Sequence, residues 1–116
     1  MIRQMLIAGV LSLAPGMGLA QGCAGQTQLE INFCAKDRWT IADGELNRLW
    51  GVVKPMADAE GRGERLLQEQ RAWLRHRDAT CEPELSNGGS ADAMFYFGCM
   101  KEMTEARNLE LRALMR

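Results

Sequence analysis

Four cysteines place the strongest constraint on how this 116-residue chain can fold. They stand at Cys23, Cys34, Cys81 and Cys99, and no two of them form the Cys-x-x-Cys pair typical of structural zinc sites. An even number of cysteines in a short exported chain indicates a disulfide framework, because the cytosol keeps thiols reduced. In an exported chain, these cysteines predict two disulfides and no metal site.

The first twenty residues have the layout of a secretory signal peptide. One cation, Arg3, precedes an uncharged apolar run over residues 5–14, and Gly18 and Ala20 are the small residues before a candidate cleavage site. An uncleaved anchor is the alternative, but the run is short for a bilayer core of about 30 Å and no stop-transfer pattern follows. We expect a signal peptide over residues 1–20 and a single mature domain over residues 21–116.

The expected location is therefore the periplasm or the medium outside a bacterial cell, with no membrane attachment after cleavage. Loss of Arg3 makes the mature chain slightly more acidic than the full chain, whose formal net charge is −1. A chain with this charge balance lacks the excess of basic residues that binds phosphate backbones, so nucleic acid is not expected as a partner. The lone histidine, His76, argues against a Ser-His-Asp hydrolase. We expect no catalytic residues, no cofactor and no metal, and hence no enzyme.

The mature region predicts helices and no strands. Thr27 and Glu30 have the spacing of a capping box, and apolar residues then recur every three or four positions, which predicts a helix over residues 28–54. Pro55 should end that helix, and a glycine-containing connection should follow up to residue 63.

A second helix is expected over residues 64–80, and Pro83 should stop it. Ser90 is expected to cap a third helix that runs to the C-terminus. The predicted fold class is all-α: a small three-helix, disulfide-stapled bundle in which the first two helices form an antiparallel hairpin.

The register of this hairpin favours one of the three possible disulfide pairings. With a loop centred near residue 59, Cys81 would lie level with residues 35–37 and hence close to Cys34. We favour Cys34 with Cys81, which leaves Cys23 with Cys99. The other pairings stay open, because a loop error of three residues moves one helix by about 4.5 Å along the other.

Several polar residues fall at positions that the helical period turns inward. Trp73 and Arg77 follow the buried spacing on the second helix, and Arg107 interrupts an apolar face on the third. A buried unpaired guanidinium would be costly, so we expect both arginines to pair with acids and to fix the helix register; a ligand site is the alternative. The available acids are Glu30, Asp43, Glu45 and Asp78. The full set of inward polar candidates is Glu30, Asp43, Asn47, Gln70, Trp73, Arg77, Asp78, Thr104 and Arg107.

An ordered series of short segments covers nearly the whole mature region. The series consists of Cys23, residues 27–35, 42–47, 70–74, 77–79, Cys81, residues 88–90, Cys99, Thr104, Arg107 and Leu111. With these segments the chain resembles the LprI-like family of small cysteine-containing bacterial envelope proteins, named after a lysozyme inhibitor. One departure is Trp50, where a tyrosine is common in the family.

The resemblance implies an exported, disulfide-bonded helical domain that inhibits a lysozyme by stoichiometric binding. It implies no particular inhibitory residue and no oligomeric state. Lysozymes are typically cationic, so the mild acidity of the mature chain permits attraction. The alternative function is a structural or adaptor module of the envelope that binds another periplasmic protein, or peptidoglycan, through a groove between helices.

Overall fold

The computed structural model describes Cys23 and residues 25–115. The predicted signal peptide lies outside these residues and stays a prediction. The described helices, in chain order, are α2 (Gln28–Ala59), α3 (Gly63–Cys81), the short 3-10 helix η1 (Glu82–Ser86) and α4 (Asp92–Ala113). No strand occurs in this part of the chain, so the predicted all-α, three-helix fold is confirmed.

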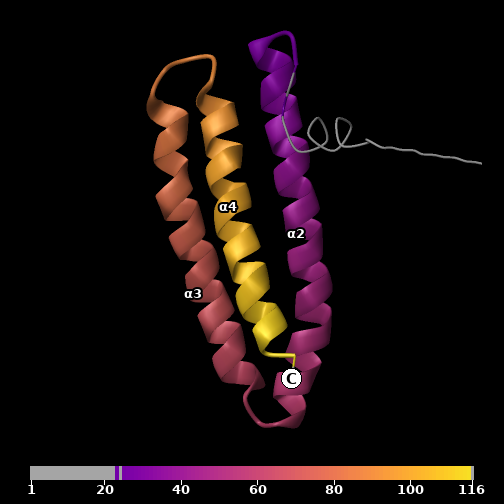
Figure 1. Ribbon diagram of the computed structural model, residues 1–116. Coiled ribbons are helices and arrows are strands. Elements are labelled where there is room, and N and C mark those ends of the chain that lie inside the picture. The colour runs from indigo at the N-terminus through magenta and orange to yellow at the C-terminus, as the bar shows by residue number, and fades with distance from the viewer. Residues whose placement is uncertain (1–22, 24, 116) are drawn as a thin grey trace, which may run out of the picture.

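The three long helices run up and down beside one another (Figure 1). α2 and α3 form the predicted antiparallel hairpin, and the chain then reverses through η1 so that α4 runs antiparallel to α3 and parallel to α2. α4 lies between the other two in this view, and its most extensive contacts are with α2. None of the helices in the described residues is long and apolar enough to cross a membrane.

The predicted capping box fixes the start of α2. The backbone N–H of Glu30 donates to the Thr27 hydroxyl at 3.1 Å, and the N–H of Thr27 donates back to the Glu30 carboxylate at 2.9 Å. The preceding chain lies so close that a Cβ on Gly25 would stand 2.6 Å from the Glu30 Cβ. The capping residues therefore set both the beginning of α2 and the path of the chain that leads to it.

The prediction that the first helix ends before Pro55 was wrong, because α2 continues through Pro55 to Ala59. Pro55 removes one helical hydrogen bond, but Val53 and Ala57 on either side of it are both buried in the core. Apolar burial on the next turn outweighs the lost bond. The chain turns only after residue 59, where Gly61 adopts a positive φ of 76° that favours glycine.

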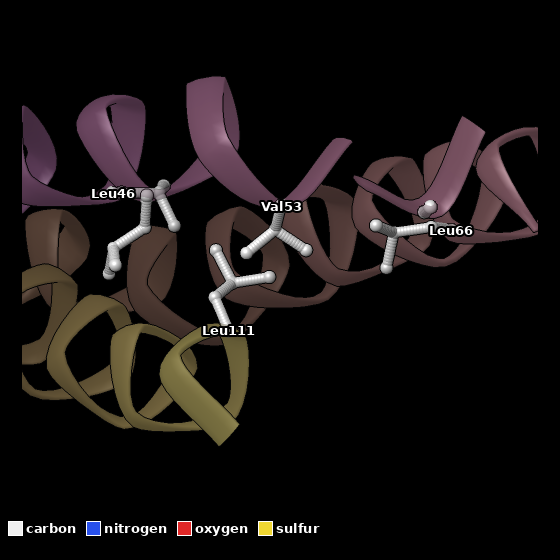
Figure 2. Packing of buried hydrophobic residues seen from close by; sticks show 6 residues of the cluster. Leu46, Val53, Leu66 and Leu111 are labelled. Carbon is white, nitrogen blue, oxygen red and sulfur yellow. The ribbon is translucent and has the colours of Figure 1, made fainter. Parts of the chain in front are cut away.

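The hydrophobic core lies where all three long helices meet. Figure 2 shows Leu111 of α4 pointing toward Leu46 and Val53 of α2, with Leu66 of α3 farther along the same seam. The buried cluster consists of Leu46, Leu49, Val53, Ala57, Leu66 and Leu111, with Trp50 and Trp73 packed against it. Toward the other end, Trp39 of α2 stacks on Phe97 of α4 with ring centroids 5.8 Å apart.

Two disulfides are present as predicted, but the favoured pairing was wrong. Cys23 pairs with Cys34, and Cys81 pairs with Cys99. The turn is centred at Gly61, and not near residue 59, so the register of the hairpin places Cys81 level with residue 41, about 10 Å along the helix from Cys34. The reversal through η1 instead brings α4 back beside the end of α3, with 5.6 Å between the Cα atoms of Cys81 and Cys99.

Ser90 does not cap α4, contrary to the prediction. The Asp92 carboxylate accepts hydrogen bonds from the backbone N–H groups of Gly88 and Gly89, at 2.9 and 3.3 Å. The carbonyl of Ser90 instead accepts from the Asn32 side chain at 2.9 Å, which ties this loop to α2. An acidic side chain at the start of the helix also suits the helix dipole.

Candidate functional site

Arg77 is buried at the centre of a polar cluster that joins the three long helices. Its Nε donates to the Asp78 carboxylate at 3.1 Å, and its Nη1 donates to the Thr104 hydroxyl of α4 at 3.2 Å. The same Nη1 lies 3.8 Å from the Asp43 carboxylate of α2. Two of the acids expected from the sequence, Asp43 and Asp78, thus neutralise this charge.

Arg107 has partners other than those expected. Its Nε donates to the side-chain carbonyl of Gln70 at 2.8 Å, and its Nη1 donates to the Glu110 carboxylate at 2.8 Å. Glu110 lies one turn further along α4 and was not among the expected acids. The buried Nη2 has no hydrogen-bond partner in the described part of the chain.

The ring of Trp73 contacts both of these arginines. The guanidinium carbon of Arg77 is 5.1 Å from the Trp73 ring centroid, and that of Arg107 is 6.0 Å from it. Both distances fall in the range of cation–π attraction. The half-buried indole therefore links a charge on α3 to a charge on α4 while its apolar body packs against the core.

The inward positions predicted from the helical period are partly correct. Gln70, Arg77 and Thr104 are buried, and Asp43, Trp73 and Arg107 are half-buried. The remaining predictions were wrong, since Glu30, Asn47 and Asp78 are exposed. The carboxylate of Glu30 is used in the capping box, far from either arginine, whereas Asp78 directly follows Arg77 and reaches it from the surface.

A groove of about 260 Å³ between α2 and α3 opens beside the cluster. Gln70 is almost fully buried in its wall, and its side-chain N–H₂ group donates to no partner within the described residues. Trp50 supplies an aromatic wall, and Asp43, Asn47 and Arg71 supply polar groups. An apolar lining with a few convergent polar groups is the usual make-up of a binding site.

Two further inter-helix contacts were missed. The Asn108 side chain is buried and donates to the backbone carbonyl of Ala42 at 3.1 Å. It stands four residues after Thr104, so extending the inner stripe of α4 by one turn would have found it. Glu45 of α2 accepts from Arg112 of α4 at 2.8 Å and also pairs with Arg48. No sequence signal distinguishes this pair from other exposed charges.

The contacts of Glu45 change its acidity. The hydrogen bonds from Arg48 and then Arg112 lower the pKa of Glu45 from 4.5 to about 2. The carboxylate is therefore ionised throughout the physiological range and holds α2 to α4. Two of the contacts between helices, Arg77 with Asp43 and Glu45 with Arg112, are thus ion pairs. In the described residues no group of three His, Cys, Asp or Glu side chains could hold a metal ion.

The class that this geometry defines is a small disulfide-bonded helical domain with grooves between its helices. The family model described as lysozyme inhibitor LprI matches residues 20–111. The chain therefore belongs to the LprI family, which is a family of inhibitors and not of enzymes. The resemblance read from the sequence is confirmed.

A protein of Rhizobium meliloti (strain 1021), described as uncharacterized, is 35% identical over 103 residues. The match covers 77% of this chain and 74% of the relative. No solved structure matches the chain.

Proposed function

We propose that the protein is exported to the periplasm and inhibits a lysozyme by stoichiometric binding. The observation that carries this proposal is the match of the LprI lysozyme inhibitor family over residues 20–111, which is nearly the whole expected mature domain. The match includes all four cysteines, and both disulfides fit an oxidising compartment outside the cytoplasm.

The architecture suits inhibition by binding. The Cys81–Cys99 disulfide ties α3 to α4, the Cys23–Cys34 disulfide ties the segment before α2 to that helix, and Arg77 bonds across the helices, so little ordering entropy is lost when a partner docks. The mild acidity of the chain favours approach to a cationic protein.

The test is a cell-wall lysis assay with purified, oxidised mature protein against c-type, g-type and i-type lysozymes. We expect lysis by at least one type to fall in proportion to the amount of added protein. Reduced and alkylated protein is the matched control and should lose the effect, because it lacks both disulfides. Unchanged lysis by all three types at high molar excess would contradict the proposal.

A second candidate function is that of an adaptor that binds another envelope protein or peptidoglycan. The groove between α2 and α3 favours it, since Asn47 and Arg71 line it and the N–H₂ group of the buried Gln70 has no partner among the residues that the structure describes. Affinity capture from periplasmic extract, with Asn47→Ala as the comparison, separates the two functions. Capture of one endogenous partner that the variant loses, without any effect on lysis, would favour the adaptor.

A further inference from the structure

We propose that the groove between η1 and α4 receives a lysine or arginine side chain of the inhibited lysozyme. This inference rests on the proposed function and adds the contact surface to it. The groove has a volume of about 380 Å³, and we call it the Phe95 groove. The lining residues that matter here are Glu84 of η1 and Met94, Phe95, Cys99, Glu102 and Met103 of α4.

The charge of the Phe95 groove is entirely negative. Glu84 and Glu102 belong to its lining, which includes no lysine or arginine. Neither carboxylate makes a side-chain hydrogen bond or ion pair within the described residues. The nearby cation Lys101 is already paired with Glu105 at 3.1 Å. Two free carboxylates on opposite walls therefore attract a cationic group from outside.

The surrounding sequence strengthens this field. From residue 78 to residue 100 the chain contains no lysine or arginine, and its charged residues are Asp78, Glu82, Glu84 and Asp92. The end of the molecule that carries η1 is thus acidic, while the overall net charge is close to zero. A cationic partner would be steered toward this end.

The apolar part of the groove suits the stem of a basic side chain. Phe95 is 53% exposed, and the half-buried Met94 and Met103 line the groove with it. Lysine and arginine lay their methylene stems on apolar surface and keep the charged head near polar groups. An aromatic ring adds cation–π attraction to this arrangement.

The walls of the Phe95 groove are held together before any partner binds. The Cys81–Cys99 disulfide joins the end of α3 directly to α4, and Cys81 is fully buried. The Met103 sulfur lies 3.8 Å from the Cys81 sulfur, so the groove packs directly on the disulfide. A preformed receptacle avoids the entropic cost of ordering on binding.

The larger groove between α2 and α4 is less suited to a basic side chain. It has a volume of about 470 Å³, but Arg38 and Arg112 are part of its lining. Its carboxylate Glu45 is already bonded to Arg48 and Arg112. Its charges are therefore largely satisfied within the molecule.

The first test compares two double variants by calorimetric titration with the lysozyme type that the wild-type protein binds most tightly. Glu84→Gln/Glu102→Gln removes both groove carboxylates, and Glu64→Gln/Glu69→Gln makes the same change in net charge at the far end of α3. We expect affinity to fall about tenfold or more for the groove pair and less than about threefold for the control.

The second test fills the groove without removing a charge. Gly98 lies in the lining, and a Cβ added there meets no atom within 4 Å, so a side chain can leave the helix toward the groove, and Gly98→Leu improves helix propensity by about 1 kcal/mol. Gly44→Leu, at an equally open helical glycine of α2, is the matched control. We expect Gly98→Leu to weaken binding about tenfold or more while thermal stability is kept, and Gly44→Leu to bind as the wild type does.

The outcomes separate this inference from the proposed function. Wild-type binding that neither groove variant weakens would overturn the Phe95 groove as the contact and leave lysozyme inhibition standing. Equal loss of lysozyme affinity in both double variants, with no effect of Gly98→Leu, would show that only the net charge of the protein matters. That result would also overturn the Phe95 groove as the contact. Absence of wild-type binding to every lysozyme type would overturn both.

Discussion

At Arg77, one guanidinium connects all three long helices. It reaches Asp43 on α2 and Thr104 on α4 from its own position on α3, and it lies over the ring of Trp73. The helical period was enough to place Arg77 and Thr104 inside, because burial follows the 3.6-residue repeat. It did not identify the partners of Arg107, since a side chain several bonds long can reach an exposed glutamate on its own helix as easily as a neighbour.

Replacing Arg77 tests the structural role of the polar cluster. Arg77→Ala should lower the free energy of unfolding by about 1 to 3 kcal/mol, because charge-assisted hydrogen bonds to Asp78 and Thr104 are lost. Arg75→Ala, at an exposed neighbouring position, should change it by less than about 0.5 kcal/mol. Urea denaturation of the oxidised proteins measures both. Equal values for the two variants would show that the cluster does not fix the helices.

Glu45 predicts a pH dependence of stability. Its pKa is about 2 in the folded chain against an ordinary value of 4.5, because Arg48 and Arg112 bond to the carboxylate. The unfolded chain therefore binds the proton more readily, so the contribution of Glu45 is complete above about pH 4.5 and is lost as the pH falls toward about 2.

The corresponding measurement is urea denaturation of the wild type and of Glu45→Gln at a series of pH values between 6 and 2. This pH range includes both pKa values of Glu45. The gap between the two proteins should narrow as the pH falls, and added salt should reduce it. Glu69→Gln serves as the control. A gap that stays constant through this range would contradict the account of the Glu45 contacts.

At the scale of elements, the sequence predicts which helices form better than where each one stops. The capping box set the start of α2 correctly, since its hydrogen bonds are local. The end of α2 was predicted wrongly because burial of Val53 and Ala57 stabilises another helical turn. That stabilisation comes from packing against other helices. The small shift of the turn toward Gly61 then changed the register and, with it, the disulfide pairing.

Pro55 should destabilise α2, because it lacks a backbone N–H group. Pro55→Ala restores the missing backbone donor and should raise the free energy of unfolding by about 1 to 3 kcal/mol. Gly51→Ala, at an open position of the same helix, is the comparison and should add about 1 kcal/mol through helix propensity alone. Both are measured by urea denaturation. Destabilisation by Pro55→Ala would indicate that the helix does not run through residue 55.

The disulfide pairing can be tested by digestion with trypsin without reduction. No lysine or arginine lies between Cys23 and Cys34, nor between Cys81 and Cys99, so each observed disulfide falls inside a single peptide. Mass spectrometry should find two separate peptides, each gaining a pair of hydrogens on reduction. A species that joins the two peptides would instead support one of the crossed pairings.

At the scale of the whole molecule, the fold class and the presence of two disulfides could be predicted, and the shape of the surface could not. The Phe95 groove is lined by η1, α4 and the end of α3, and the Cys81–Cys99 disulfide ties α4 to the end of α3. Spacing along the chain left three pairings open, so the groove had no signal in the sequence. The groove between α2 and α3 could be predicted in part, since Gln70 and Asp43, which line it, were both among the inward candidates.

The most direct measurement is a titration of lysozyme activity against the molar ratio of added oxidised protein, at a lysozyme concentration well above the dissociation constant. A rigid domain that acts by docking should lower activity linearly until an end point near one equivalent, with no further change over time. Activity that is unaffected at large excess, or that keeps falling with time at substoichiometric amounts, would contradict the account.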